Sequence, residues 1–298
     1  MEAHPEAEKP TSPLVDQFEN LNLGEDTDKP VKKFIGPDGT EYPSKSKMNK
    51  AISRQRTNEK KVLRKTARPI SHFVSLPVCH SAELKAAYIE WRDDIMAHKY
   101  NETLIPRIFL RPEILHFTIL KLPLENEERV EQCREFMKSI EVEVQELIKA
   151  RGPNGKLVLK FNKLRFLGSP ENTRFVEMGL QEDTEEFDLL QDVVHIVISK
   201  ALEQGVLERH ELQHVKWDKN KNRYTLTLFH CSLVNSSWGQ NDLLKMRGRR
   251  DFDGREIVEK HMDLLKFPDI EAATLEVSTR KKYDPETGMY LSQYTINI

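Results

Sequence analysis

Short apolar runs alternate with periodically apolar segments over most of the chain, from about Pro69 to Ile298. The runs are rich in β-branched and aromatic residues and predict strands, whereas apolar positions that recur every three or four residues predict helices. The predicted strands cover residues 70–78, 114–122, 157–166, 174–179, 224–234, 274–279 and 290–298. Helices are predicted over 81–95, 125–151 and 187–201, with a short fourth helix starting near 253.

Local signals bound these elements and indicate a fold class. Ser81 can cap the first helix with its hydroxyl, and Gly205 is placed to close the third helix. Strands alternate with single helices, glycine-rich phosphate loops do not follow the strands, and the order of elements partly repeats. We therefore expect an α+β fold of two related lobes rather than a nucleotide-binding α/β domain.

Charge divides the N-terminal part of the chain into opposed blocks. The 298 residues hold 46 Lys plus Arg and 48 Asp plus Glu, a formal net charge of -2. Residues 1–30 contain eight acidic and two basic side chains, whereas residues 45–68 contain ten basic side chains and one acidic. We expect an acidic disordered tail over 1–44, a basic arm over 45–68 and one folded domain over 69–298. The basic arm suits a nuclear-localisation signal or a contact with RNA phosphates, and equally a solvated helix face.

Other compositional features exclude several classes of protein. The three cysteines, Cys79, Cys133 and Cys231, are too few and too far apart for a disulfide framework or a four-cysteine zinc site. Apolar runs stay well short of the roughly 18 residues that a membrane span needs, and the N-terminus lacks the order of a secretory signal. We expect an intracellular protein that binds no membrane, located in the nucleus, the cytoplasm or both.

Two of the apolar strands carry the same pattern of chemistry. One contains His116-Phe117-Thr118, and the other contains His230-Cys231-Ser232. Side chains alternate along a strand, so each histidine faces the same side as the hydroxyl two residues later, about 6 to 7 Å away. Each strand therefore presents an imidazole beside a hydroxyl.

This pairing suits the cleavage of a phosphodiester. The reaction needs a base to deprotonate the attacking oxygen and an acid to protonate the leaving oxygen, and imidazoles serve in both roles near neutral pH. A hydroxyl from each strand can donate a hydrogen bond to the phosphoryl oxygens without a metal. One such motif alone is weak evidence, but two in matching strands favour a functional interpretation over two structural histidines.

The pair of motifs resembles the duplicated His-x-Thr/Ser signature of the two-histidine (2H) phosphoesterases, the superfamily of the LigT-like proteins. The segments RPISHFVSLPV, LHFTILKL and RDFDGREIVEK look like the phosphoesterase domain shared by the activating signal cointegrator complex subunit and A-kinase-anchoring-protein-like members. The resemblance covers about residues 69–298. Ser232 stands where Thr is commoner in the family, which preserves the hydroxyl, and a KH domain like that of the cointegrator subunit is not evident.

The resemblance implies a bilobal fold, a site and an activity. Each pseudo-symmetric lobe would hold an antiparallel sheet with helices and would place one motif strand on a shared cleft. His116 and His230 would be the catalytic pair, with Thr118 and Ser232 binding phosphate. Family members act on 2′,3′-cyclic phosphates, 2′-5′ linkages or RNA ends without a metal cofactor, so no cofactor is expected.

Two further patterns call for an interpretation. Positive charge gathers after the second motif, where it would steer an RNA substrate if the loop borders the cleft, or would simply be solvated. Its members are Lys245, Arg247, Arg249 and Arg250. The segment 210–214 reads HELQH, the zinc-peptidase motif, but it lacks the sustained helix and the third ligand that a zinc site needs. We interpret HELQH as a chance occurrence.

Two hypotheses of different classes follow. The first is a metal-independent phosphoesterase, either a cyclic phosphodiesterase or an RNA-end-processing enzyme, in which His116 and His230 act as general base and general acid. The alternative is an RNA-binding or scaffold subunit of a transcription-coactivator or RNA-repair complex that uses the cleft for recognition. The expected partners are RNA or a cyclic nucleotide phosphate and, under the alternative, subunits of such a complex.

Overall fold

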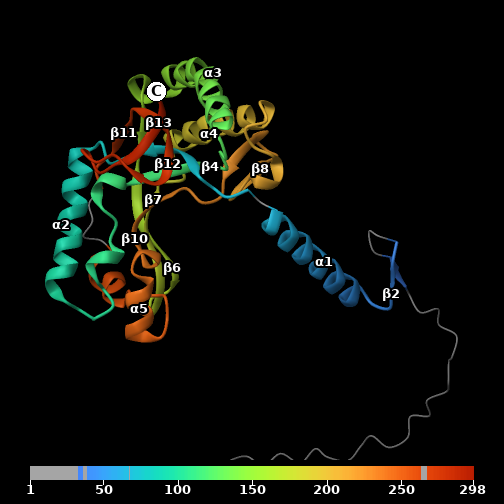
Figure 1. The fold of residues 1–298 in the computed structure, drawn as a ribbon, viewed down its shortest axis with the longest axis horizontal. Coiled ribbons are helices and arrows are strands. Elements are labelled where there is room, and N and C mark those ends of the chain that lie inside the picture. The colour runs from blue at the N-terminus through green and yellow to red at the C-terminus, as the bar shows by residue number, and fades with distance from the viewer. Residues whose placement is uncertain (1–32, 36–38, 67, 263–266) are drawn as a thin grey trace, which may run out of the picture. The chain divides into compact units, whose positions relative to one another are not determined.

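The computed structural model describes residues 33–35, 39–66, 68–262 and 267–298, which form two compact units, one up to Lys65 and one from Thr66 onward (Figure 1). In the first unit, the antiparallel strands β1 (Phe34–Ile35) and β2 (Glu41–Tyr42) precede helix α1 (Lys45–Thr66). The basic arm is thus helical, and the strand pair was not predicted within 1–44. The disorder predicted for residues 1–32 concerns a stretch outside the described residues.

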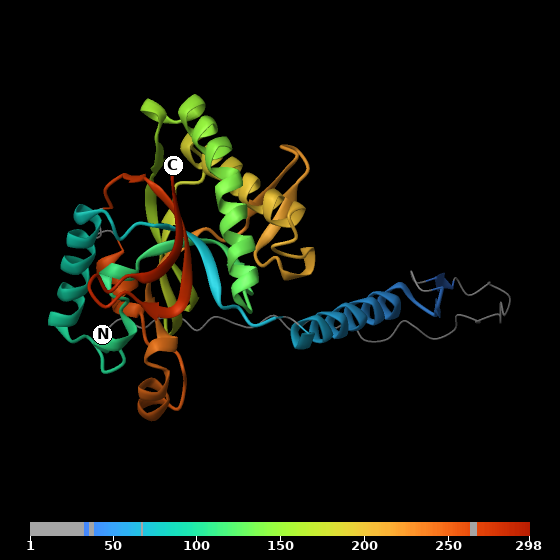
Figure 2. The same cartoon turned by 45° about the horizontal axis from the view of Figure 1, so that its top comes forward.

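The second unit contains two antiparallel sheets that define two lobes (Figures 1 and 2). The first-lobe sheet has the strand order β13-β12-β3-β4, and the second-lobe sheet has the order β10-β7-β6. Two smaller pairs, β11-β5 and β8-β9, flank them. The strands of the unit are β3 (His72–Pro77), β4 (His116–Leu122), β5 (Leu157–Leu159), β6 (Phe161–Ser169), β7 (Asn172–Leu180), β8 (Val215–Asp218), β9 (Arg223–Leu226), β10 (His230–Asn235), β11 (Ile270–Ala272), β12 (Thr274–Tyr283) and β13 (Tyr290–Asn297).

Helices pack on both lobes. Helix α3 lies against β13 and α4, and α4 in turn lies against β5 and β9. The α-helices of this unit are α2 (Ala82–His98), α3 (Glu127–Arg151), α4 (Glu185–Glu203) and α5 (Gln240–Arg247). Short turns of 3-10 or π type are η1 (Pro106–Ile108), η2 (Pro112–Ile114), η3 (Pro153–Gly155), η4 (Arg209–Glu211), η5 (Ser236–Trp238) and η6 (Ile257–His261). The α+β class and the two-lobed architecture are confirmed.

The local signals in the sequence act as expected at two helix ends. The Ser81 hydroxyl accepts a hydrogen bond from the Leu84 N–H at 3.1 Å and caps α2. Gly205 adopts a left-handed backbone, with φ at +67°, directly after α4. Two strand predictions were wrong, because residues 157–166 and residues 224–234 each form two strands rather than one. β5 pairs with β11 whereas β6 pairs with β7. β9 pairs with β8 whereas β10 pairs with β7, so the chain must leave one partner before it joins the other.

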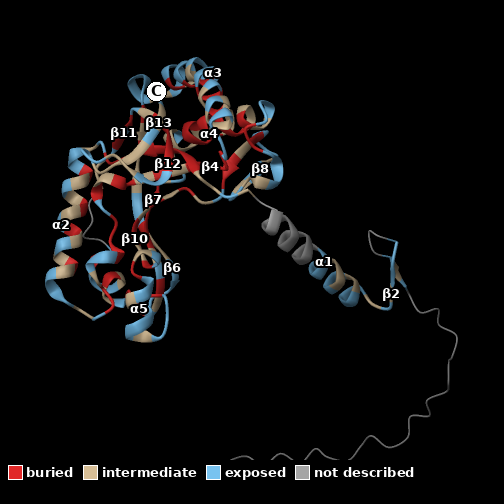
Figure 3. Cartoon of the chain, viewed as in Figure 1, coloured by how far each residue is buried: buried red, intermediate tan, exposed pale blue. Residues whose placement is uncertain are grey.

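The hydrophobic core continues between the lobes (Figure 3). Phe117 of β4 is fully buried and stacks on Phe229, which directly precedes β10, with ring centroids 5.2 Å apart. Phe161 of β6 stacks on Phe117 at 5.9 Å. Residues from both lobes thus bury one another in a single core, which holds the two motif strands against each other. Among the described residues, no helix is long and apolar enough to cross a membrane.

Tyr88 of α2 ties the second motif strand to the segment that precedes the first. Its buried hydroxyl lies 2.7 Å from the Leu110 carbonyl oxygen and 2.9 Å from that of Leu233, which is part of β10. The Leu110 N–H also donates to the Leu233 carbonyl at 2.9 Å. A buried carbonyl without a donor is costly, so this hydroxyl stabilises the contact between the lobes.

We expect the substitution Tyr88→Phe to lower the free energy of unfolding by about 1–2 kcal/mol, because the Leu110 carbonyl loses its donor while ring packing is kept. Urea denaturation followed by circular dichroism measures the change. The matched control is Tyr294→Phe in β13, where the partly buried hydroxyl has no hydrogen-bond partner among the described residues. Equal losses in the two variants would contradict the role given to the Tyr88 hydroxyl.

Candidate active site

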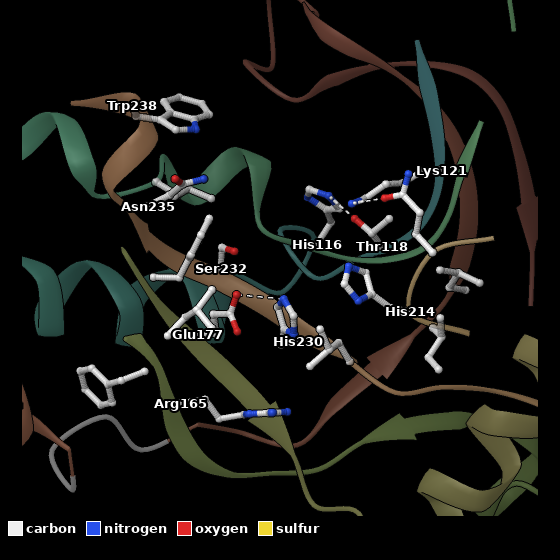
Figure 4. A pocket seen from close by; sticks show the side chains of 18 of the residues that line it. His116, Thr118, Lys121, Arg165, Glu177, His214, His230, Ser232, Asn235 and Trp238 are labelled. Atoms are coloured by element: carbon white, nitrogen blue, oxygen red, sulfur yellow. Dashed lines mark hydrogen bonds and ion pairs between the residues drawn. The ribbon is translucent and has the colours of Figure 1, made fainter. Parts of the chain in front are cut away.

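The His116 and Thr118 side chains emerge from β4 into a cleft between the lobes (Figure 4). Phe117 between them points into the core, so strand alternation directs its two neighbours to the opposite side. The cleft has a volume of about 440 Å³. Its lining also includes His230 and Ser232 from β10. All four residues predicted from the two motifs therefore line one cleft.

Hydrogen bonds fix the proton of His116. Its Nδ1 lies 2.8 Å from the Ile114 carbonyl oxygen, which can only accept, so Nδ1 carries the hydrogen. Nε2 lies 3.1 Å from the Thr118 hydroxyl. Burial lowers the pKa of His116 below its ordinary value of 6.5, while the Ile114 hydrogen bond and the nearby Glu276 oppose this shift. The imidazole is therefore neutral at pH 7, with an electron pair available on Nε2.

Aromatic rings hold the His116 imidazole in place. Phe73 of β3 stacks on it with ring centroids 4.8 Å apart, and Tyr290 of β13 meets it edge-on at 5.3 Å. Phe73 and Tyr290 also contact each other. The first-lobe sheet thus supplies both the histidine and the aromatic walls that restrict its orientation.

His230 has a different environment. Its Nε2 lies 2.9 Å from Oε1 of Glu177, a β7 residue whose side chain is 10% exposed. The carboxylate accepts, so Nε2 of His230 carries a hydrogen. Nδ1 is buried and has no hydrogen-bond partner among the described residues. In the β7–β10 register, Glu177 lies opposite Ser232, and Gly179 lies opposite His230.

The two motif strands share an irregularity that the sequence analysis missed. Each has a β-bulge directly after its hydroxyl residue, where the extra residue is Ile119 in β4 and Leu233 in β10. A bulge reverses the alternation of the residues beyond it. Lys121 and Asn235, each five residues after its motif histidine, consequently both line the cleft. These bulges are a local sign of the pseudo-symmetry between the lobes.

Other residues of the cleft also escaped sequence reasoning. Glu177, Arg165 of β6 and His214 all line it. Glu177 and Arg165 are opposite each other in the β6–β7 pair, and that register cannot be read from single strands. His214 belongs to the HELQH segment, and the presence of that unusual motif was the one available signal.

The HELQH segment does not form the helix that a zinc peptidase requires. Residues Arg209–Glu211 form the single turn η4, and His214 adopts a left-handed backbone with φ at +58°. The Glu211 carboxylate is bound by Arg68 at 2.6 and 2.8 Å. Within the described ranges, no group of three or more His, Cys, Asp or Glu side chains is arranged to hold a metal ion.

The four basic residues predicted to steer a substrate do not line the cleft. Lys245 and Arg247 belong to α5, and Arg249 and Arg250 follow it. Asp251 lies 4.0 Å from Arg247 and 3.5 Å from Arg249, so part of this charge is countered locally. Steering by these residues from outside the cleft stays a prediction.

The chain is similar to several solved structures and matches one family model. The chain is similar to solved structures of Escherichia coli LigT complexed with NADP+ (13% identity, TM-score 0.43, 78% of this chain and 99% of that chain) and Kluyveromyces marxianus Usb1 (16% identity, TM-score 0.43, 77% and 98%). No curated protein matches the chain. The model of the AKAP7 2′5′ RNA ligase-like domain, a 2H phosphoesterase domain, matches residues 70–298. Because that match extends over most of the chain, the protein belongs to the family of the AKAP7 2′5′ RNA ligase-like domain.

Proposed function

We propose that the protein is a phosphoesterase that acts on RNA ends or on nucleotide cyclic phosphates. The single observation that carries this proposal is the convergence of two imidazole–hydroxyl pairs, from two strands far apart in sequence, on one cleft. Side chains alone supply an acid, a base and two hydroxyl donors, so the chemistry does not require a metal. Membership of the AKAP7 2′5′ RNA ligase-like family supports the same class of activity.

The hydrogen bonds of the two histidines support different roles. Nε2 of His116 carries no hydrogen, and its electron pair, which accepts from the Thr118 hydroxyl in the free protein, would take the proton of a 2′-hydroxyl or a water as that oxygen attacks phosphorus. His230, in its imidazolium form beside the Glu177 carboxylate, would give its Nε2 hydrogen to the leaving oxygen as the bond from that oxygen to phosphorus breaks, and the ring would become neutral. The Thr118 and Ser232 hydroxyls would donate to the phosphoryl oxygens, on which charge accumulates. Reversal of the reaction exchanges the two roles.

Glu177 would act on the reaction through His230. A carboxylate beside an imidazole fixes the ring orientation and decides which nitrogen bears the hydrogen. The leaving oxygen would compete with Glu177 for the Nε2 hydrogen of His230, which is 2.9 Å from the carboxylate oxygen. Glu177 is therefore a positioning residue in this mechanism.

Finer assignments extend this proposal. Similarity to the cointegrator complex subunit suggests a role beside coactivator or RNA-repair proteins, in the nucleus, the cytoplasm or both. The basic helix α1 and the basic residues around α5 would each contribute cations to RNA binding, since clustered cations gain from counterion release. A scaffold subunit that binds RNA through the cleft without turnover is the competing function.

We expect His116→Ala and His230→Ala each to lower turnover of a nucleoside 2′,3′-cyclic phosphate and of short RNAs about 10²- to 10⁴-fold, because each removes one proton-transfer group. Product formation is measured with purified protein in EDTA. The matched control is His98→Ala, which removes a half-exposed histidine of α2 outside the cleft. Wild-type activity in both cleft variants would refute the assignment. RNA binding by a wild type that forms no product would instead favour the scaffold function.

The protonation state of His116 gives a second test. Because burial lowers its pKa, we expect the ring to lose its proton below pH 6.5 and to stay neutral as the pH rises further. NMR titration of the imidazole carbon-bound hydrogens measures the midpoint, and His116→Asn identifies the resonance. A midpoint above 6.5 would show that the ring is charged near neutrality and would remove the basis for its role as general base.

A further inference from the structure

The HELQH segment is held in a defined conformation beside the cleft. Arg68 binds the Glu211 carboxylate through two hydrogen bonds, and the Glu211 side chain is 6% exposed. Farther along, the His214 carbonyl accepts hydrogen bonds from the N–H and the hydroxyl of Thr227, at 2.7 and 2.9 Å. These contacts support the left-handed backbone of His214, which is uncommon for a residue other than glycine.

Lys121 joins this segment to the first motif strand. Its Nζ lies 3.3 Å from the side-chain oxygen of Gln213, next to His214. Both Lys121 and His214 line the cleft that also contains His116 and His230 (Figure 4). Lys121 follows Thr118 by three residues along β4, so their Cα atoms are up to about 10 Å apart. Lys121 therefore starts from a part of β4 beyond the hydroxyl that would bind the reacting phosphate, and His214 lies near enough to both Lys121 and His230 to interact electrostatically with each.

Lys121 brings to this part of the cleft a positive charge that no ion pair among the described residues neutralises. Among them, neither Lys121 nor His214 forms an ion pair, whereas His230 is paired with Glu177, and Glu182 lies 4.0 Å from Arg165. Partial burial lowers the pKa of His214, and the nearby Lys121 and His230 lower it further. An anion bound between these groups would relieve their mutual repulsion and favour a protonated His214.

The position equivalent to Lys121 in the other lobe carries no charge. Asn235 of β10 stands at the position equivalent to Lys121, after the equivalent bulge, and also lines the cleft. Asn235 is neutral, and its side-chain oxygen accepts from Ser237. The two equivalent positions, Lys121 and Asn235, therefore differ in charge although their strands are built alike.

We propose that Lys121 and His214 form a second phosphate subsite, which binds the neighbouring phosphate of an oligonucleotide substrate. This inference rests on the proposed phosphoesterase function, and it narrows the substrate class from mononucleotides to nucleotide chains. Lys121 supplies a fixed positive charge and three donors, and the protonated His214 supplies a directed N–H. Gln213 holds the Lys121 side chain, and Thr227 holds the backbone of His214, before the ligand binds.

Binding rather than turnover tests the subsite. Isothermal titration at one ionic strength compares a nucleoside 3′-monophosphate with the same nucleoside 3′,5′-bisphosphate. We expect wild type to bind the bisphosphate at least about tenfold more tightly, since the second phosphate gains charge-assisted hydrogen bonds. Lys121→Met and His214→Asn should each reduce this preference at least about fivefold. Methionine keeps the apolar stem of lysine, and asparagine tolerates the left-handed backbone at 214.

The control variant is Lys216→Met, which removes an exposed lysine of β8 outside the cleft and should keep the wild-type preference. Thermal unfolding checks that each variant is folded. If His214→Asn does not fold, the nucleotide preference of Lys121→Met alone decides the test. Equal affinity of wild type for both nucleotides, no binding of either, or a preference unchanged in the variants would overturn the subsite. If wild type prefers the bisphosphate and the variants lose that preference, but wild type forms no product, only the proposed phosphoesterase function is overturned.

Discussion

Burial of the residue between each histidine and its hydroxyl is the constraint on which the site depends. Phe117 and Cys231 are completely buried, and strand alternation therefore sends the polar residues on either side of them to the cleft. Phe117 stacks on Phe229, so the hydrophobic core beneath the cleft contains residues of both lobes. The hydrophobic effect thus orients the polar groups of both lobes through one contact. A loosened core would disturb the relative position of the histidines as well as stability.

A β-bulge in each motif strand decides which residues beyond the hydroxyl face the cleft. In each motif strand the alternation holds through the hydroxyl and is reversed by the extra residue after it. The carbonyl of Leu233, the extra residue of β10, is bound by both the Leu110 N–H and the Tyr88 hydroxyl. Helix α2 therefore stabilises an irregularity that brings Asn235 into the cleft lining. Similar strand construction in both lobes places an imidazole–hydroxyl pair from each lobe on one cleft, while the residues after the bulges, Lys121 and Asn235, differ in charge.

Sequence reasoning succeeded where the determining interactions are local. Apolar runs rich in β-branched and aromatic residues were sufficient to predict a strand at each motif, although the second was merged with β9, and Ser81 and Gly205 marked the ends of α2 and α4. It failed where strand register or a change of partner decides the outcome. The Glu177–His230 contact depends on the pairing of β7 with β10, and the break between β9 and β10 depends on their different partners. Neither pairing has a signature within a single strand.

The two histidines show that equal motifs do not imply equal chemistry. His116 and His230 occupy the same place in their strands, but one ring donates to the Ile114 carbonyl and the other to the Glu177 carboxylate. The first arrangement leaves an electron pair toward the cleft, and the second keeps a hydrogen on Nε2. This difference suits a phosphodiester reaction, because one ring has to begin as the base and the other as the acid. The negative charge of Glu177 also balances the cleft near His230, so that the unbalanced positive charge lies beside Lys121. The formal net charge of -2 for the whole chain is therefore compatible with a polyanionic ligand, because binding responds to the local field of the cleft rather than to the sum.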